Sequence, residues 1–222
     1  MCPSPASRFA LHPEVPLEIL PEALRGRLGP EAPLPVRKLA ARGLLPVEPA
    51  EMVAALAYLT THDPDTAVRD DALAALTGMP PGILGPVLRD PSTPPPLLAV
   101  CALHFLNDSR AIEAIVLNAA TPDEAVAYVA ARGEGAVLDM VGTNQVRMQR
   151  HARIAEALYF NPQTPTGTAA RAIEFAVRAG LDLSHLPGFR EIAQSIFGEV
   201  PEDAPVVPSD APVAPAAAAD ES

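Results

Sequence analysis

The 222-residue sequence has no tryptophan, and aromatic residues make up only 4% of it. Charged residues are also scarce, at 19%, whereas hydrophobic residues reach 49%. Much of this hydrophobic fraction is alanine, which favours helices and has little surface to bury. The composition therefore favours helices built from small side chains, and it leaves few aromatic anchors for a partner.

Cysteine is nearly absent: the chain has only Cys2 and Cys101. Two cysteines suggest neither a disulfide framework nor a zinc site. Cys101 lies in the apolar run LLAVCALHFL and is expected to be a small core residue. No uninterrupted apolar run is long enough to cross a membrane as a helix, and early prolines interrupt any signal-like segment, so no membrane association is expected. A soluble cytoplasmic protein is the default expectation.

Basic residues are few as well. The formal net charge is −11, and all 16 basic residues except Lys38 are arginine. An acidic chain is not expected to bind nucleic acid or anionic membranes non-specifically, because both need an excess of Lys and Arg. The negative charge is concentrated in residues 61–143, whereas residues 144–200 are slightly basic.

No short run alternates apolar and polar side chains convincingly, so strands are not expected. Apolar residues instead recur with the period of an α-helix. Most of the early prolines fit helix starts or connections. The sequence therefore predicts an all-α fold. The expected inward residues include Met52, Val53, Leu56 and Leu59; Leu97, Leu98, Cys101, Ala102 and Phe105; Ile112, Ile115 and Val116; Ile154, Ala155 and Leu158.

Two helix starts are predicted from their residues. Asp108 is expected to cap the helix over 109–117. The string TPDE predicts a capping box, with Thr121 as the N-cap, Pro122 as the first helical residue and Glu124 as the third.

Composition divides the chain into three parts. Residues 1–15 are expected to form an irregular arm, and residues 16–200 a single helical domain that includes a last helix over 187–197. Residues 201–222 hold many prolines and alanines, no basic residue and few large apolar groups. Such a segment cannot bury enough surface to order itself, so a disordered acidic tail is predicted.

A repeat is visible in the connections between the predicted helices. Asp63, Asp90, Asn118 and Asn144 follow one another at nearly equal intervals, but Asn161 comes after a much shorter one. Two helices fit between successive connections, which predicts stacked antiparallel helix pairs. The residues expected to end and restart helices are Asp63, Pro64, Arg69, Asp90, Pro91, Asn118, Thr121, Pro122, Asn144, Asn161 and Pro162.

The string HDPDTAVRDDALAAL at 62–76 resembles the HEAT-repeat consensus, with matches at Asp63, Pro64, Val68, Arg69, Ala72 and Leu76. The short period and the NPQTP connection resemble the leucine-rich-repeat variant, a repeat made only of helices. The resemblance extends loosely over residues 49–180. It implies a short, irregular HEAT-like right-handed solenoid with a binding or scaffold role, and it brings no catalytic residues.

The sequence offers no catalytic, cofactor-binding or metal-ligating residues. The five histidines have no ligand spacing such as HExxH. The strings RGEG and TPTGT do not follow strands and lack the Gly-Lys pair of a phosphate-binding loop, so they are interpreted as helix ends.

One local basic cluster remains: Arg147, Arg150, His151 and Arg153. On a continuous helix the three arginines would lie close to one face. They are candidates for docking an acidic peptide, a phosphate or a nucleic-acid backbone. The alternative is a solvated face that bridges to the acidic 61–143 region or to the tail.

The sequence therefore predicts a non-catalytic scaffold or adaptor that binds another protein along one solenoid face. One alternative is nucleic-acid binding by a HEAT-like arch, as in the alkylpurine glycosylases that this architecture resembles, with Arg147, Arg150, Arg153 and Arg178 converging on one face. A third possibility is an enzyme, which would need a deep pocket with perturbed titratable groups.

Overall fold

The computed structural model describes residues 8–187, 189 and 194. In this part of the chain, helices alternate with short connections and no β-strand occurs. The prediction of an all-α fold is confirmed for these residues. Most of the predicted helix over 187–197 lies outside them, as do residues 1–7 of the predicted arm and the whole predicted tail 201–222.

The helices are short, as the closely spaced prolines and glycines predict. A 3-10 helix, η1, covers Leu17–Ile19. The α-helices of the described part are α2 (Glu22–Leu28), α3 (Leu34–Ala41), α4 (Pro49–His62), α5 (Thr66–Thr77), α6 (Pro81–Arg89), α7 (Pro95–His104), α8 (Ser109–Leu117), α9 (Asp123–Arg132), α10 (Ala136–Thr143), α11 (Gln145–Arg150), α12 (Arg153–Phe160) and α13 (Thr166–Arg178).

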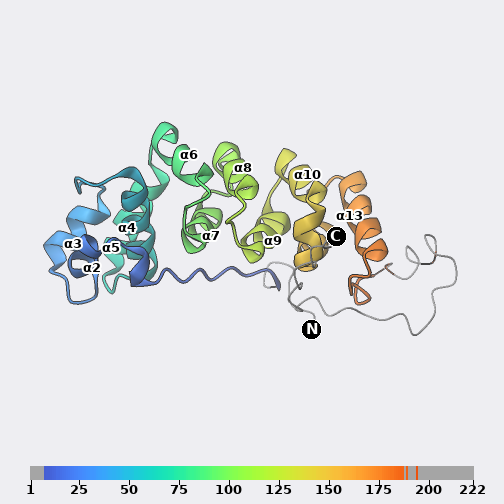
Figure 1. Cartoon of the computed structure of the whole chain (residues 1–222), viewed down its shortest axis with the longest axis horizontal. Helices are drawn as coiled ribbons and strands as arrows, with labels where there is room; N and C mark the ends of the chain where they lie inside the picture. Colours follow the sequence, from blue (N-terminus) through green and yellow to red (C-terminus); the bar gives the residue numbers. More distant parts are fainter. Residues whose placement is uncertain (1–7, 188, 190–193, 195–222) are drawn as a thin grey trace, which may run out of the picture.

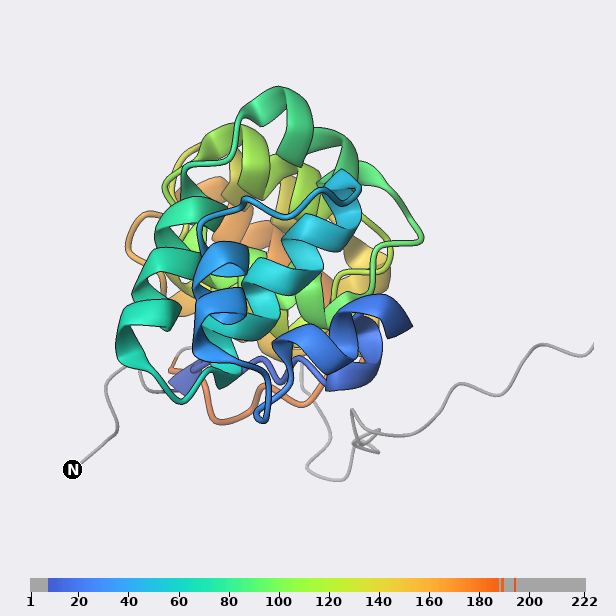
Figure 2. The same ribbon diagram turned by 90° about the vertical axis from the view of Figure 1, so that its left-hand side faces the viewer.

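Most of these helices lie in two rows along the long axis of the molecule (Figure 1). In one row α6 packs on α8, α8 on α10, and α10 on α13. In the other row α4 packs on α7, α7 on α9, and α9 on α12. Seen along the long axis, the helices lie behind one another (Figure 2). From α6 to α10 and from α7 to α9, each row advances by one helix for every two helices of sequence, whereas the steps from α4 to α7, α9 to α12 and α10 to α13 each span three.

The rows follow a regular interval in the sequence. Helices α6, α8, α10 and α13 begin at residues 81, 109, 136 and 166, and α7, α9 and α12 begin at 95, 123 and 153. From α6 onward, successive helices of a row thus start at nearly equal intervals along the chain, whereas α4 begins at residue 49, much farther before α7. The short helix α11 lies between α10 and α12 and lengthens the last of these intervals.

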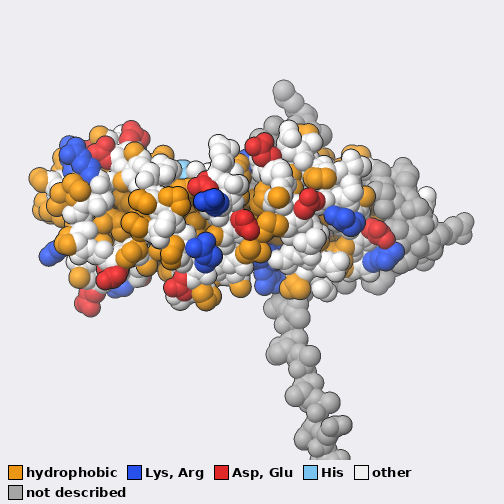
Figure 3. Space-filling model, turned by 90° about the horizontal axis from the view of Figure 1, so that it is seen from above, with side chains coloured by type: hydrophobic (Ala, Val, Ile, Leu, Met, Phe, Trp, Pro, Cys, Tyr) orange, Lys and Arg blue, Asp and Glu red, His pale blue; other side chains and the backbone are white. Residues whose placement is uncertain are grey.

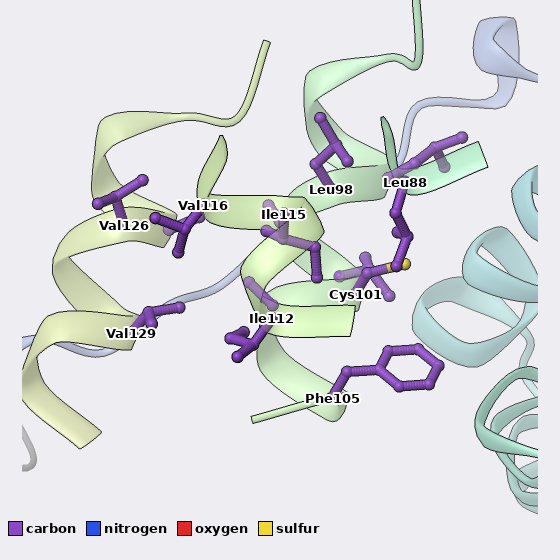
Figure 4. Close-up of a cluster of buried hydrophobic side chains, with 14 of the residues drawn as sticks. Leu88, Leu98, Cys101, Phe105, Ile112, Ile115, Val116, Val126 and Val129 are labelled. Atoms are coloured by element: carbon purple, nitrogen blue, oxygen red, sulfur yellow. The ribbon is translucent and has the colours of Figure 1, made fainter. Parts of the chain in front are cut away.

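One continuous apolar core lies between the rows. Figure 4 shows its central part, where Leu88, Leu98, Phe105, Ile112 and Val129 converge from α6, α7, α8 and α9. The inward residues predicted from the helical period, named above, are all buried. Cys101 is fully buried in the same cluster, and this burial raises the pKa of its thiol to about 12.

Helix α4 shows how an alanine-rich sequence makes a core. Its residues 52–59 are all buried, so neighbouring helices cover every side of it. Ala54, Ala55 and Ala57 are among them, and their small side chains let neighbouring helices approach closely. Close packing of small residues therefore takes the place of the missing aromatic side chains.

The helix starts confirm one prediction and correct another. Asp108 caps α8, since its carboxylate accepts hydrogen bonds from the backbone N–H groups of Arg110 and Ala111. The predicted capping box at Thr121 is wrong: Pro122 is the N-cap of α9. The Thr121 hydroxyl instead donates to the carbonyl oxygen of Ile115, which ties the start of α9 back to the end of α8.

Candidate functional site

The predicted docking cluster does not lie on a continuous helix. Helix α11 ends at Arg150, and α12 begins at Arg153. The backbone leaves the helical conformation at His151, which separates the two helices. The Asn144 side chain starts α11 by accepting a hydrogen bond from the backbone N–H of Arg147. The three arginines are therefore held by two helices with different directions.

Arg147 is buried, with 5% of its surface exposed. Its guanidinium donates to the carbonyl oxygens of Asn118 and Thr121 and to the Asp123 carboxylate, each at 2.7 Å. Because only 6% of this side chain is exposed, little of it is accessible to a partner. Its geometry assigns Arg147 to the fold, where it joins α11 to the connection between α8 and α9.

Arg150 binds the same carboxylate from the outside. Its Nε and Nη2 atoms donate to the two Asp123 oxygens at 2.8 Å each, while the Arg150 side chain remains half exposed. Partial burial works against the charged form of Asp123, but the hydrogen bonds from Arg150 and Arg147 outweigh it and lower the Asp123 pKa. The same hydrogen bond raises the pKa of Arg150. Asp123 belongs to the acidic 61–143 region, which matches the bridging alternative for these two arginines.

Arg153 faces a different part of the chain. Its guanidinium donates to the carbonyl oxygen of Arg8 and lies over the Phe9 ring, 5.3 Å from the ring centre. Arg178 pairs with Glu174 one turn earlier in α13, at 2.6 Å. The arginines considered for nucleic-acid binding are thus engaged in contacts within the chain. Docking of a partner by Arg150, His151 and Arg153 remains a prediction.

Four of the predicted connector residues form the same type of turn. The side-chain oxygens of Asp63, Asp90, Asn118 and Asn161 each accept a hydrogen bond from the backbone N–H two residues later, at 2.8 to 2.9 Å. This turn replaces the hydrogen bond that a continued helix would have made. Pro64, Pro91 and Pro162 follow immediately and are exposed.

Asp63, Asn118 and Asn161 also bind more distant parts of the chain. The Asn118 amide donates to the carbonyl oxygens of Leu88 and Asp90, at 2.8 and 2.9 Å. Asp63 is buried and pairs with Arg37 of α3, while Arg69 of α5 donates to the Asp63 carbonyl oxygen. Most of these polar groups are hydrogen-bonded, as the interior of a protein requires, but the buried Oδ2 atom of Asp63 has no partner in the described part of the chain.

The structure explains the irregular position of Asn161. Asp63 and Asn161 follow α4 and α12, which belong to one row, whereas Asp90 and Asn118 precede α7 and α9 of that same row. The four residues therefore occupy two kinds of connection. Asn144 follows α10 of one row and Asn161 follows α12 of the other, so the interval between them in the sequence is short although both rows continue.

Two arginines missed in the sequence have no partner in the described part of the chain. Arg89 at the end of α6 and Arg110 at the start of α8 line a hollow of about 400 Å³ together with Glu113 and Leu117. No hydrogen bond or ion pair of their side chains occurs within residues 8–187. Arg89 could have been noticed, because no acidic residue lies three or four positions from it.

An apolar hollow of about 530 Å³ lies near the other end of α6. Leu45, Val47, Met52, Met79 and Ile83 line it, together with Arg42 and several small residues. Ile83 and the nearby Leu44 are large apolar side chains with 44% and 60% of their surface exposed. Figure 3 shows hydrophobic side chains gathered over this end of the molecule, next to charged groups towards its middle.

Other chemistry has little support in the described residues. No group of three His, Cys, Asp or Glu residues among them could hold a metal ion. None of their helices is long and apolar enough to cross a membrane. Burial lowers the pKa of His104, but no acidic side chain hydrogen-bonds it in this region.

Comparisons with known proteins do not assign the chain to a family. No family model matches the chain, and neither a curated protein nor a solved structure is significantly similar to it. Its class therefore rests on the fold: an all-α protein with short helices in two rows.

Proposed function

We propose that this chain is a non-catalytic helical-repeat protein of the cytoplasm that binds another protein through the surface around α6. In this proposal the two rows form a short, right-handed, HEAT-like solenoid of antiparallel helix pairs. From α6 onward, the nearly constant interval between helices of a row supports a repeat, and so do the connectors that hydrogen-bond to an earlier connection.

One observation carries the binding role: an apolar hollow and two unpaired arginines lie at opposite ends of the same helix. Ile83 lines the first hollow and Arg89 the second. From Ile83 to Arg89 an α-helix advances by ~9 Å. Exposed apolar surface next to unpaired arginines is typical of interfaces, where arginine and large apolar groups contribute much of the binding energy.

The geometry also limits the partner. Arg89 and Arg110 would bind carboxylates, although Glu113 in the same hollow reduces its net charge to +1. The apolar hollow would take a leucine-sized or larger side chain. A segment that carries one apolar residue and one acidic residue would match both hollows.

The test is affinity capture from the native organism with the full chain as bait. Ile83→Asp and the double variant Arg89→Glu/Arg110→Glu should each reduce recovery of the partner at least fivefold. The matched controls are Val146→Asp, at an apolar residue of α11 that is 70% exposed, and Arg178→Glu in α13. Equal recovery with all four variants would contradict the proposal.

A further inference from the structure

Residues 8–16 lie across the surface of the helices. From here on, the term arm refers to these residues only. The arm has no regular secondary structure beyond its first two residues and crosses the molecule from α12 to α4 (Figure 1). No backbone–backbone hydrogen bond of the described chain involves residues 9–15. The arm is thus held by side chains and by a few isolated contacts of its backbone.

The arm side chains alternate between the helices and solvent. Phe9 and Val15 are 3% and 0% exposed, and Leu11 and Pro13 between them are half-buried. Ala10, His12, Glu14 and Pro16 point outward and are exposed. A period of two residues is that of an extended chain lying on a surface. The sequence pattern FALHPEVP contains this alternation, which the expectation of no alternating run missed.

Three side chains bind backbone atoms of the arm, so these contacts do not depend on the arm's side chains. Arg132 donates to the carbonyl oxygen of Phe9 at 2.8 Å, and Arg153 donates to that of Arg8. His62 accepts a hydrogen bond from the Val15 N–H at 3.3 Å. His62 and Arg132 are the last residues of α4 and α9, and Arg153 is the first of α12. Three helices of a single row therefore hold the arm in one direction.

The contacts at the start of the arm favour a basic side chain at position 8. Arg8 pairs with Glu156 at 3.1 Å, and its guanidinium lies 4.9 Å from the centre of the Phe160 ring. The Glu156 side chain is only 9% exposed, and its Oε1 atom also lies 3.2 Å from Nε2 of His185. A carboxylate buried to this degree favours a basic residue in the place of Arg8.

We propose that the surface under the arm is a binding groove for an extended peptide of another protein, and that the arm occupies it when no partner is present. The peptide carries a basic residue followed by apolar residues at every second position. It lies along the ends of α4, α9 and α12, binds Glu156 through the basic residue and gives its carbonyl oxygens to Arg132 and Arg153. This groove lies away from the hollows at α6, so the two proposals can fail separately.

The first experiment releases the arm in the full chain with Phe9→Asp/Val15→Asp. A fluorescein-labelled peptide with the sequence of residues 6–17, ASRFALHPEVPL, is then titrated and followed by anisotropy. We expect a Kd at least tenfold lower for the released variant than for the wild-type chain, because the tethered arm competes at an effective concentration of roughly millimolar. A scrambled peptide, and one with glutamate in the place of Arg8, should bind at least fivefold more weakly than the original.

Equal binding of the original and scrambled peptides to a folded variant would overturn the proposal. The second experiment does not depend on the folding of that variant. Hydrogen exchange in residues 8–16 of the wild-type chain should become faster in 1 mM unlabelled peptide, and an unchanged rate would overturn the proposal. Dimers of the released variant, detected by light scattering, would also overturn it, since a second copy would then be the occupant.

Discussion

The side chain of Asn161 makes the same three hydrogen bonds as the side chain of Asn118. Each oxygen accepts from the backbone N–H two residues later. Each amide donates to one carbonyl oxygen in the last turn of an earlier helix and to one just after the end of that helix. For Asn161 these carbonyls are those of Ala130 and Gly133, at 2.8 and 2.9 Å. Both side chains are buried, so neighbouring parts of each row are joined by polar contacts as well as by apolar packing.

Replacement of Asn118 by alanine should therefore destabilise the fold. Asn118→Ala leaves the carbonyl oxygens of Leu88 and Asp90 and one backbone N–H without their partner, and each such loss costs about 1 kcal/mol or more where the group is buried. We expect the free energy of unfolding to fall by about 2–3 kcal/mol in urea titrations followed by circular dichroism. Asn144→Ala is the control, because the half-buried Asn144 side chain makes one N-cap bond worth about 1 kcal/mol. Equal losses of unfolding free energy in the two variants would show that the hydrogen bonds from Asn118 to Leu88 and Asp90 do not stabilise the fold.

A second prediction separates Arg147 from Arg150. Arg147→Met removes a buried guanidinium from two carbonyl oxygens and a carboxylate, so a loss of about 3 kcal/mol in unfolding free energy is expected. Arg150→Met removes an exposed ion pair and should cost less than about 1 kcal/mol. The urea midpoints of the two variants measure the difference. Similar midpoints would mean that Arg147 does not connect α11 to α9.

These arginines show what the sequence could and could not predict. The helical period identified the buried apolar residues, because burial of one helix face requires that pattern. The exposed face of the arginines was inferred from their spacing, which applies only to a continuous helix. Nothing local in the sequence places Asp123 beside residues 24 and 27 positions later, since that proximity arises from the packing of α9, α11 and α12.

The arm illustrates the opposite case. Its alternating pattern is present in the sequence, but the pattern alone does not indicate what the extended chain packs against. Alternation over Phe9 to Val15 is a signal for extended structure, but the signal is usually read for strands that pair in a sheet. Here the extended chain packs on helix ends instead. The contacts that hold it come from residues 62, 132 and 153, which a local pattern cannot bring together.

Asp123 gives the protein a predicted dependence on acid. Its pKa is lowered in the folded state from a usual value near 3.8, so its ionised form stabilises the fold. This contribution is fully present above about pH 4 and is lost as the pH falls through the lower, folded pKa. Wild type should therefore be more stable than Asp123→Asn at pH 7, and the difference should shrink between pH 4 and pH 2. Thermal unfolding of both proteins across this range measures it, and a constant difference would contradict the assignment.

The contact between α10 and α13 can be tested at a single glycine. A Cβ atom added to Gly142 would collide with Cγ2 of Thr168, which is buried in α13. Thr168 cannot turn away freely, because its hydroxyl donates to the Asp139 carboxylate. Gly142→Ala should then force the two helices apart and lower the unfolding free energy by about 1–3 kcal/mol, a typical cost of overpacking.

Gly167 provides the matched substitution in α13. A Cβ atom added there meets nothing within 4 Å, and the residue is exposed. Gly167→Ala should leave the unfolding free energy unchanged or raise it by up to about 1 kcal/mol, because alanine favours a helix more than glycine does. Opposite signs for the two alanines in parallel urea titrations would separate the packing of α10 on α13 from helix propensity. If Gly142→Ala also stabilised the protein, the two helices would have to be farther apart than the structure places them.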